Sequence, residues 1–133
     1  AQIEFDLLKA VRLLPERPVL PTRPSRAAAY AALSRMYLMM ERYPDALQYA
    51  DSCLAIQSEL MDYNELDVSA VNSFRELNPE VIFHAKLQGQ SGVLTLSRAR
   101  VDTLLYAMYD ADDLRKTLFF ESNNDGSFLF KGS

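Results

Sequence analysis

Residues 26–54 read RAAAYAALSRMYLMMERYPDALQYADSCL, and this stretch decides the fold class. Apolar side chains recur in it at the spacing of one helical face, first before and then after Pro44. Proline suits the first turn of a helix, so Pro44 marks the start of a second helix. Two amphipathic helices joined by a few residues pack antiparallel. The stretch therefore predicts a helical hairpin.

The hairpin matches the 34-residue tetratricopeptide pattern when Ala27 is taken as its first position. Small side chains at several contact positions would let the two helix backbones approach closely. A single unit of this kind cannot bury its own face, so further packing partners are expected. We place the tetratricopeptide-like helical hairpin at residues 26–58. Its expected packing residues are Tyr30, Leu33, Ser34, Tyr37, Ala46, Ala50 and Cys53.

Upstream of the hairpin, the sequence predicts one more helix and a stiff connection. An apolar stripe from Ile3 to Leu14 has helical spacing. Pro15 ends that helix, because proline lacks a backbone donor and clashes with the preceding turn. Further prolines at 18, 21 and 24 hold the following backbone extended. Ser25 is expected to cap the first helix of the hairpin.

Downstream of residue 60 the apolar periodicity weakens, and residues 61–79 are predicted to be mostly loop. Alternating apolar residues then predict a short strand near residues 81–87. A helix capped by Ser97 is expected after this strand and should bury one stripe of side chains. That stripe consists of Val101, Leu104, Leu105 and Met108.

The last part of the chain predicts a short helix and a β-hairpin. Asp112 and Asp113 suit the start of a helix, because carboxylates favour helix N-termini. An Asp-Gly pair at 125–126 between apolar runs is typical of a hairpin turn, so a β-hairpin is expected near residues 118–131. The predicted fold class is mainly α, with further helices beside the hairpin and a small β component. Residues 1–133 are predicted to be a single partial domain.

The charge balance argues against nucleic acid as a partner. The chain has 14 Lys and Arg against 18 Asp and Glu, a net charge of −4, whereas nucleic-acid binders carry a basic footprint. A single cysteine leaves no internal disulfide, and no apolar run approaches the ~20 residues that cross a bilayer. One early group of arginines, interleaved with prolines, is interpreted as a solvated connection: Arg12, Arg17, Arg23 and Arg26.

Three segments, taken in order, resemble the SusD/RagB-like family. The first is residues 26–54, and the second is NPEVIF at residues 78–83. The third is DDLRK at residues 112–116, followed by Phe119 and Phe120. The resemblance covers roughly residues 3–133 and depends on the order of the three segments.

This resemblance implies a mostly helical lipoprotein of the outer membrane, at the cell surface of Bacteroidetes-type bacteria. Proteins of this family bind glycans without catalysis and pass them to a SusC-like TonB-dependent outer-membrane transporter, as a step in nutrient uptake and polysaccharide utilization. The chain would be an internal fragment that serves mainly as scaffold. It would reach the membrane only through a lipid anchor that it does not itself carry. No cofactor is implied.

The residue inventory gives little support for catalysis or for a metal site. Glycoside hydrolysis needs two facing carboxylates, but acidic residues here form local clusters near 65–67 and 110–113, which turn and helix capping explains. His84 is the single histidine and Cys53 the single cysteine, too few for a protein-only Cys/His zinc site. We therefore expect a chain that is not an enzyme and holds no metal or cofactor.

Glycan contact is predicted for the loop after the expected strand and for the helix beyond that loop. Amides and guanidinium groups suit sugar hydroxyls, and aromatic rings stack on sugar faces. The candidates are Gln88, Gln90, Arg98, Arg100 and Tyr106. The alternative function is a tetratricopeptide adaptor that binds peptides in protein–protein interactions. That alternative predicts further repeats beside residue 27 or residue 60, and the sequence shows none.

Overall fold

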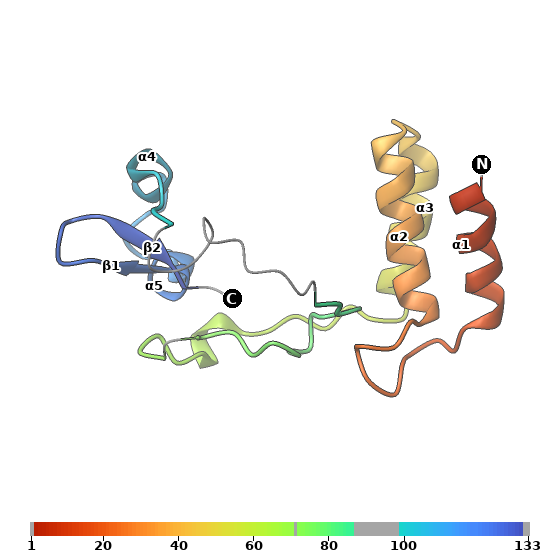
Figure 1. The fold of residues 1–133 in the computed structure, drawn as a ribbon, viewed down its shortest axis with the longest axis horizontal. Coiled ribbons are helices and arrows are strands. Elements are labelled where there is room, and N and C mark those ends of the chain that lie inside the picture. Colours follow the sequence, from red (N-terminus) through yellow and green to blue (C-terminus); the bar gives the residue numbers. More distant parts are fainter. Residues whose placement is uncertain (1, 71, 87–98, 132–133) are drawn as a thin grey trace. The chain divides into compact units, whose positions relative to one another are not determined.

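The computed structural model describes residues 2–70, 72–86 and 99–131. Within these residues it contains five α-helices and one two-stranded antiparallel sheet (Figure 1), which confirms the predicted mainly helical fold with a small β component. The residues fall into two compact units, which we describe separately. Unit 1 comprises Ala1–Leu60 and Pro79–Lys86, and unit 2 comprises Met61–Asn78 and Leu87–Ser133. That the whole chain is a single partial domain stays a prediction.

Unit 1 is built from three helices. Helix α1 (Gln2–Leu13) and helix α3 (Tyr43–Leu54) both pack against α2 (Arg26–Met39), as Figure 1 shows. The predicted helical hairpin is therefore confirmed as α2 and α3. Leu33, Tyr37 and Ala46 form its buried core. Side chains of α1 pack on the same core: Leu7, Leu8 and Val11.

Both helices of the hairpin begin where the sequence predicts. The Ser25 hydroxyl accepts a hydrogen bond from the backbone N–H of Ala28 at 3.2 Å, so Ser25 caps α2 and is itself fully buried. Pro44 lies in the first turn of α3, where its missing N–H leaves no helical hydrogen bond unmade. Local sequence therefore determines where each helix starts.

Helix α2 ends in a Schellman motif. The N–H of Arg42 donates to the carbonyl of Tyr37 at 2.9 Å, and the N–H of Glu41 donates to the carbonyl of Leu38 at 3.0 Å. Glu41 has a φ of 58°, the left-handed conformation that this motif needs and that glycine adopts most easily. The chain thereby reverses direction within the short stretch between Met39 and Tyr43.

The connection between α1 and α2 is a closed loop, which we call the proline loop (residues 15–26). Its ends meet where the N–H of Arg26 donates to the carbonyl of Pro15 at 2.7 Å. The Arg26 guanidinium also pairs with Glu16 at 3.2 Å. The predicted extended backbone is wrong here: between the prolines the chain turns, with the N–H of Arg23 donating to the carbonyl of Leu20 at 2.8 Å.

The strand predicted near residues 81–87 does not form in its described part. Residues 81–86 are irregular, and residue 87 lies outside the described residues. The N–H of His84 donates to the carbonyl of Pro21 at 2.9 Å, so this segment lies beside the proline loop. Alternating apolar residues form a strand only when a second strand pairs with their backbone, and a proline-rich neighbour lacks the donors for a ladder.

Unit 2 holds α4 (Thr103–Ala107), α5 (Leu114–Phe119), β1 (Phe120–Ser122), β2 (Phe128–Phe130) and a short 3-10 turn, η1 (Tyr63–Glu65). The predicted β-hairpin is confirmed, with Phe120 opposite Phe130 and with Gly126 at a φ of 79° in the turn. It is shorter than expected, because α5 continues to Phe119. The described residues between 61 and 78 are loop apart from η1, as predicted.

Helix α4 begins at a later residue than predicted, and a different side of it is buried. It begins at Thr103, because the Asp102 carboxylate accepts the N–H of Leu104 at 2.8 Å and caps it; Ser97 lies outside the described residues. Three members of the expected apolar stripe, Leu104, Leu105 and Met108, are exposed, with Leu104 at 75% and Met108 at 79%, while Val101 is half-buried. Tyr106 is half-buried instead. A tyrosine ring buries more area than an aliphatic side chain, so it takes the inner side of the helix.

We predict that Glu41→Gly raises the free energy of unfolding by about 0.5–1 kcal/mol. The left-handed conformation costs a residue with a side chain about 1–2 kcal/mol, and the greater freedom of glycine in the unfolded chain offsets part of the gain. Urea unfolding followed by circular dichroism measures the change. The matched control is Ala32→Gly at an exposed position of α2, which should lower stability by about 1 kcal/mol. Equal destabilisation by both variants would contradict the prediction.

Candidate functional site

A buried tyrosine joins the three helices of unit 1. Tyr37 is 3% exposed, and its hydroxyl donates a hydrogen bond to the carboxylate of Glu4 at 2.7 Å. The Arg42 guanidinium lies over the Tyr37 ring, 4.5 Å from the centroid. Arg42 also pairs with Glu4 at 3.4 Å and with Asp45 at 2.8 Å. We call Tyr37, Glu4, Arg42 and Asp45 the Tyr37 cluster. Glu4 and Arg42 contact the tyrosine directly, and Asp45 is connected to it through Arg42.

The Tyr37 cluster shifts the ionisation of its members. The hydrogen bond to Glu4, helped by burial, raises the pKa of Tyr37 to about 12. The same hydrogen bond holds the pKa of Glu4 below its usual value, and the positive charge of Arg42 adds to this effect. A hydrogen bond to Asp45 raises the pKa of Arg42. The cluster therefore keeps a neutral tyrosine between fixed charges, an arrangement suited to holding helices together.

The residues expected to pack the repeat are buried to different extents in unit 1. Leu33, Tyr37, Ala46 and Cys53 are buried, while Tyr30, Ser34 and Ala50 are half-buried. The Ser34 hydroxyl donates to the carbonyl of Ala46 at 2.8 Å, a direct bond between α2 and α3. Burial raises the pKa of the Cys53 thiol, which makes it a poor nucleophile at neutral pH. That these residues form a tetratricopeptide unit stays a prediction.

Five aspartates of unit 2 stabilise local turns. Each carboxylate accepts the backbone N–H of the residue two positions ahead, the arrangement of an Asx-turn. They are Asp62, Asp67, Asp102, Asp113 and Asp125. Hydrogen bonds received from Asn64, Ser69, Arg115 and Ser127 lower the pKa of Asp62, Asp67, Asp113 and Asp125, respectively. The predicted capping roles of Asp67 and Asp113 are confirmed. A general acid needs the opposite shift, a raised pKa.

Aromatic rings form the core of unit 2. Tyr106 stacks on Phe128, with centroids 3.6 Å apart and planes at 14°, and meets the edge of Phe120 at 5.6 Å. Phe119 contacts one ring from each strand of the β-hairpin and two rings from residues 61–78. The rings of this cluster are Tyr63, Phe74, Tyr106, Tyr109, Phe119, Phe120, Phe128 and Phe130. Leu118, in α5, is also fully buried.

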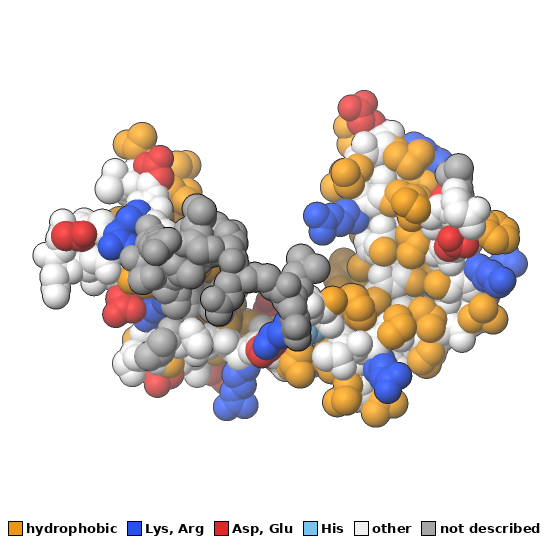
Figure 2. Space-filling model, viewed as in Figure 1, with side chains coloured by type: hydrophobic (Ala, Val, Ile, Leu, Met, Phe, Trp, Pro, Cys, Tyr) orange, Lys and Arg blue, Asp and Glu red, His pale blue; other side chains and the backbone are white. Residues whose placement is uncertain are grey.

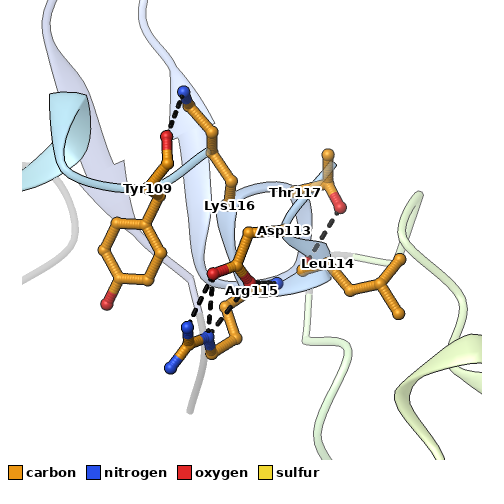
Figure 3. A network of polar contacts seen from close by, with 6 residues as sticks. All are labelled: Tyr109, Asp113, Leu114, Arg115, Lys116 and Thr117. Carbon is orange, nitrogen blue, oxygen red and sulfur yellow. Dashed lines mark hydrogen bonds and ion pairs between the residues drawn. The ribbon is translucent and has the colours of Figure 1, made fainter. Parts of the chain in front are cut away.

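A polar network borders the aromatic core (Figure 3). The Lys116 ammonium donates to the carbonyl of Tyr109 at 2.8 Å and lies 4.9 Å from the centroid of Tyr106. The Arg115 guanidinium pairs with Asp113 at 2.6 Å and lies 5.3 Å from the centroid of Tyr109. These cations therefore hold α5 against Tyr106 within α4 and Tyr109 just after it.

Two of the five predicted glycan contacts belong to the described residues. Gln88, Gln90 and Arg98 lie outside them, so the structure places neither these side chains nor their loop. Arg100 is exposed. Tyr106 is half-buried, and its ring already contacts Phe128, Phe120 and Lys116. Tyr106 thus contributes to the core of unit 2, and its contact with a sugar stays a prediction.

The Tyr37 cluster is the feature that sequence reasoning missed. The sequence predicts Tyr37 as an apolar packing residue, without assigning a partner to its hydroxyl. The sequence contains one indication of this partner. A buried tyrosine needs a hydrogen bond, and Glu4 is the acidic residue in the first turn of α1, the helix that packs beside α2.

The part of the chain that the structure describes offers neither a metal site nor a membrane span. It holds no group of three or more His, Cys, Asp or Glu side chains that could bind a metal ion. No helix within it has both the length and the apolar character needed to cross a membrane.

One family model matches part of the chain. It is a SusD-like family, described as starch-binding and associating with the outer membrane, and the match spans residues 1–38 of 133. The matched part holds α1, the proline loop and nearly all of α2. No match was found among curated proteins or among solved structures. Over this part, the chain is similar to SusD-like proteins.

We predict that Tyr37→Phe removes a stability loss that occurs at alkaline pH. The pKa of Tyr37 is raised from 10.0 to about 12 in the folded chain, so the unfolded chain releases this proton first. The stabilising effect is complete below about pH 10 and is lost as the pH rises through about 12. Stability of the unmodified chain should therefore fall more steeply over this range than that of the variant.

Urea midpoints measured at several alkaline pH values test this difference. Tyr43→Phe is the matched control, because Tyr43 is 60% exposed. That control should keep the pH dependence of the unmodified chain. The prediction is wrong if Tyr37→Phe and Tyr43→Phe lose stability with the same slope.

Proposed function

We propose that this chain is the helical scaffold of a non-catalytic glycan-binding protein that captures polysaccharides at the outer membrane. The observation that carries this proposal is the match of residues 1–38 to a SusD-like family described as starch-binding and associating with the outer membrane. The order of the three segments at 26–54, 78–83 and 112–120 supports it from the rest of the chain.

The scaffold role rests on how the chain uses its polar groups. The Tyr37 cluster, the Asx-turn aspartates and the network at Lys116 all bind other parts of the same unit. A glycan contact, by contrast, needs donors and acceptors that remain available to sugar hydroxyls. We therefore assign the glycan contacts to Gln88, Gln90, Arg98 and Arg100, together with Tyr106 of α4.

The proposal includes partners and a location. The protein would be attached to the cell surface by a lipid anchor, in a Bacteroidetes-type bacterium, and would deliver its glycan to a SusC-like TonB-dependent transporter. The hairpin at residues 26–58, as a tetratricopeptide-like unit, would serve as scaffold and add surface toward the transporter. The SusD-like, RagB-related assignment and the absence of catalysis belong to the same proposal.

Affinity gel electrophoresis tests glycan binding directly. A longer natural protein that contains this chain should migrate more slowly in gels with starch or a related polysaccharide than in plain gels, and should release no reducing sugar. Replacing Gln88, Gln90 and Arg98 together by alanine should weaken the retardation about tenfold or more, because several hydrogen bonds are lost. Gln48→Ala, at an exposed position of α3, is the matched control and should change nothing.

Two results would overturn the proposal. One is the absence of retardation on every glycan of a broad panel. The other is release of reducing sugar by the purified protein, which would make it an enzyme. If glycans fail and an extended peptide library binds the α2–α3 face instead, the tetratricopeptide adaptor is the better interpretation.

A further inference from the structure

Hydrogen bonds close the proline loop and tie it to other parts of unit 1. The hydrogen bond between Arg26 and Pro15 closes it, and the turn from Leu20 to Arg23 forms its tip. The Arg17 guanidinium donates to the carbonyl of Ile56, and the backbone of His84 donates to Pro21. Prolines at 18, 21 and 24 further reduce its conformational freedom. Binding through such a loop costs little ordering entropy.

The tip of the proline loop is apolar. Val19 is 96% exposed, the most exposed large hydrophobic side chain of the described residues, and Leu20 is 57% exposed. Figure 2 shows hydrophobic side chains around a cationic one at the lower edge of unit 1, where Figure 1 places this loop. Moving these side chains out of water is favourable, and the rigid loop prevents them from folding inward.

The stretch between Glu16 and Glu41 is positively charged, on a chain whose net charge is −4. No Asp or Glu occurs between Glu16 and Glu41, whereas four arginines do: Arg17, Arg23, Arg26 and Arg35. Glu16 is paired with Arg26 at 3.2 Å. Arg23, in the turn that forms the tip, is exposed and enters no ion pair with the described residues. The loop therefore combines two apolar side chains with positive charge.

We propose that the proline loop docks on an anionic lipid surface. Val19 and Leu20 enter the interfacial layer, and Arg23 lies among the headgroup phosphates. A soluble polyanion would pair with Arg23 but leave the apolar tip in water, whereas an anionic bilayer accommodates both. Two apolar side chains give a weak and reversible contact, which orients the protein on the membrane without anchoring it. This docking does not depend on the glycan-binding function.

Tryptophan fluorescence provides the first test, because the chain contains no Trp. The emission of V19W should shift to the blue on addition of vesicles of phosphatidylcholine with phosphatidylglycerol, and brominated lipids should quench it. M39W is the matched control: Met39 is 80% exposed at the end of α2, and its emission should stay unchanged. No shift for V19W, or an equal shift for M39W, would overturn the proposal.

Co-sedimentation of the unlabelled chain provides the second test. The chain should bind the phosphatidylglycerol vesicles more than pure phosphatidylcholine vesicles, and less as salt rises. Replacing Val19 and Leu20 together by serine should lower the partition coefficient about tenfold or more, and Arg23→Gln should lower it by a smaller factor. Met39→Ser should leave it unchanged. Binding that survives the double substitution, or is absent from the outset, would contradict membrane docking.

Discussion

The hydrogen bond from Tyr37 to Glu4 is the interaction on which unit 1 depends. It links α1 to the hairpin beside the apolar contacts of Leu7, Leu8 and Val11, and it allows a phenol to be buried without an unmade hydrogen bond, which would cost about 1–3 kcal/mol. Arg42 reaches the same ring only because Glu41 adopts the left-handed conformation just before it. Side chains from α1, from α2 and from the start of α3 therefore all meet at one tyrosine.

The parts of the fold that the sequence predicts are those that local chemistry determines. Ser25 accepts a backbone N–H wherever a helix begins just after it, and Pro44 favours a first turn in any context. The hairpin turn with Gly126 and the cap at Asp113 are equally local. None of these predictions needs knowledge of residues across the fold, and all of them hold.

The predictions that differ from the structure needed distant information. The segment at 81–86 lies beside a proline-rich loop that cannot pair with it as a strand, and α4 turns Tyr106 rather than Leu104 inward because aromatic rings lie on that side. The candidate glycan residues could be chosen by type alone. Their placement is a tertiary property: Tyr106 belongs to the aromatic core, and Gln88, Gln90 and Arg98 lie outside the described residues.

The Schellman motif also constrains how this chain can vary in length. Each residue added to or removed from a helix rotates the chain beyond it by about 100°. An insertion or deletion at Glu41 would therefore turn the inner face of α3 away from α2 and separate Arg42 from Tyr37. Length changes should be tolerated far better in the loop stretches of unit 2, where no helix register depends on them. Natural relatives that differ in length should keep this reversal unchanged.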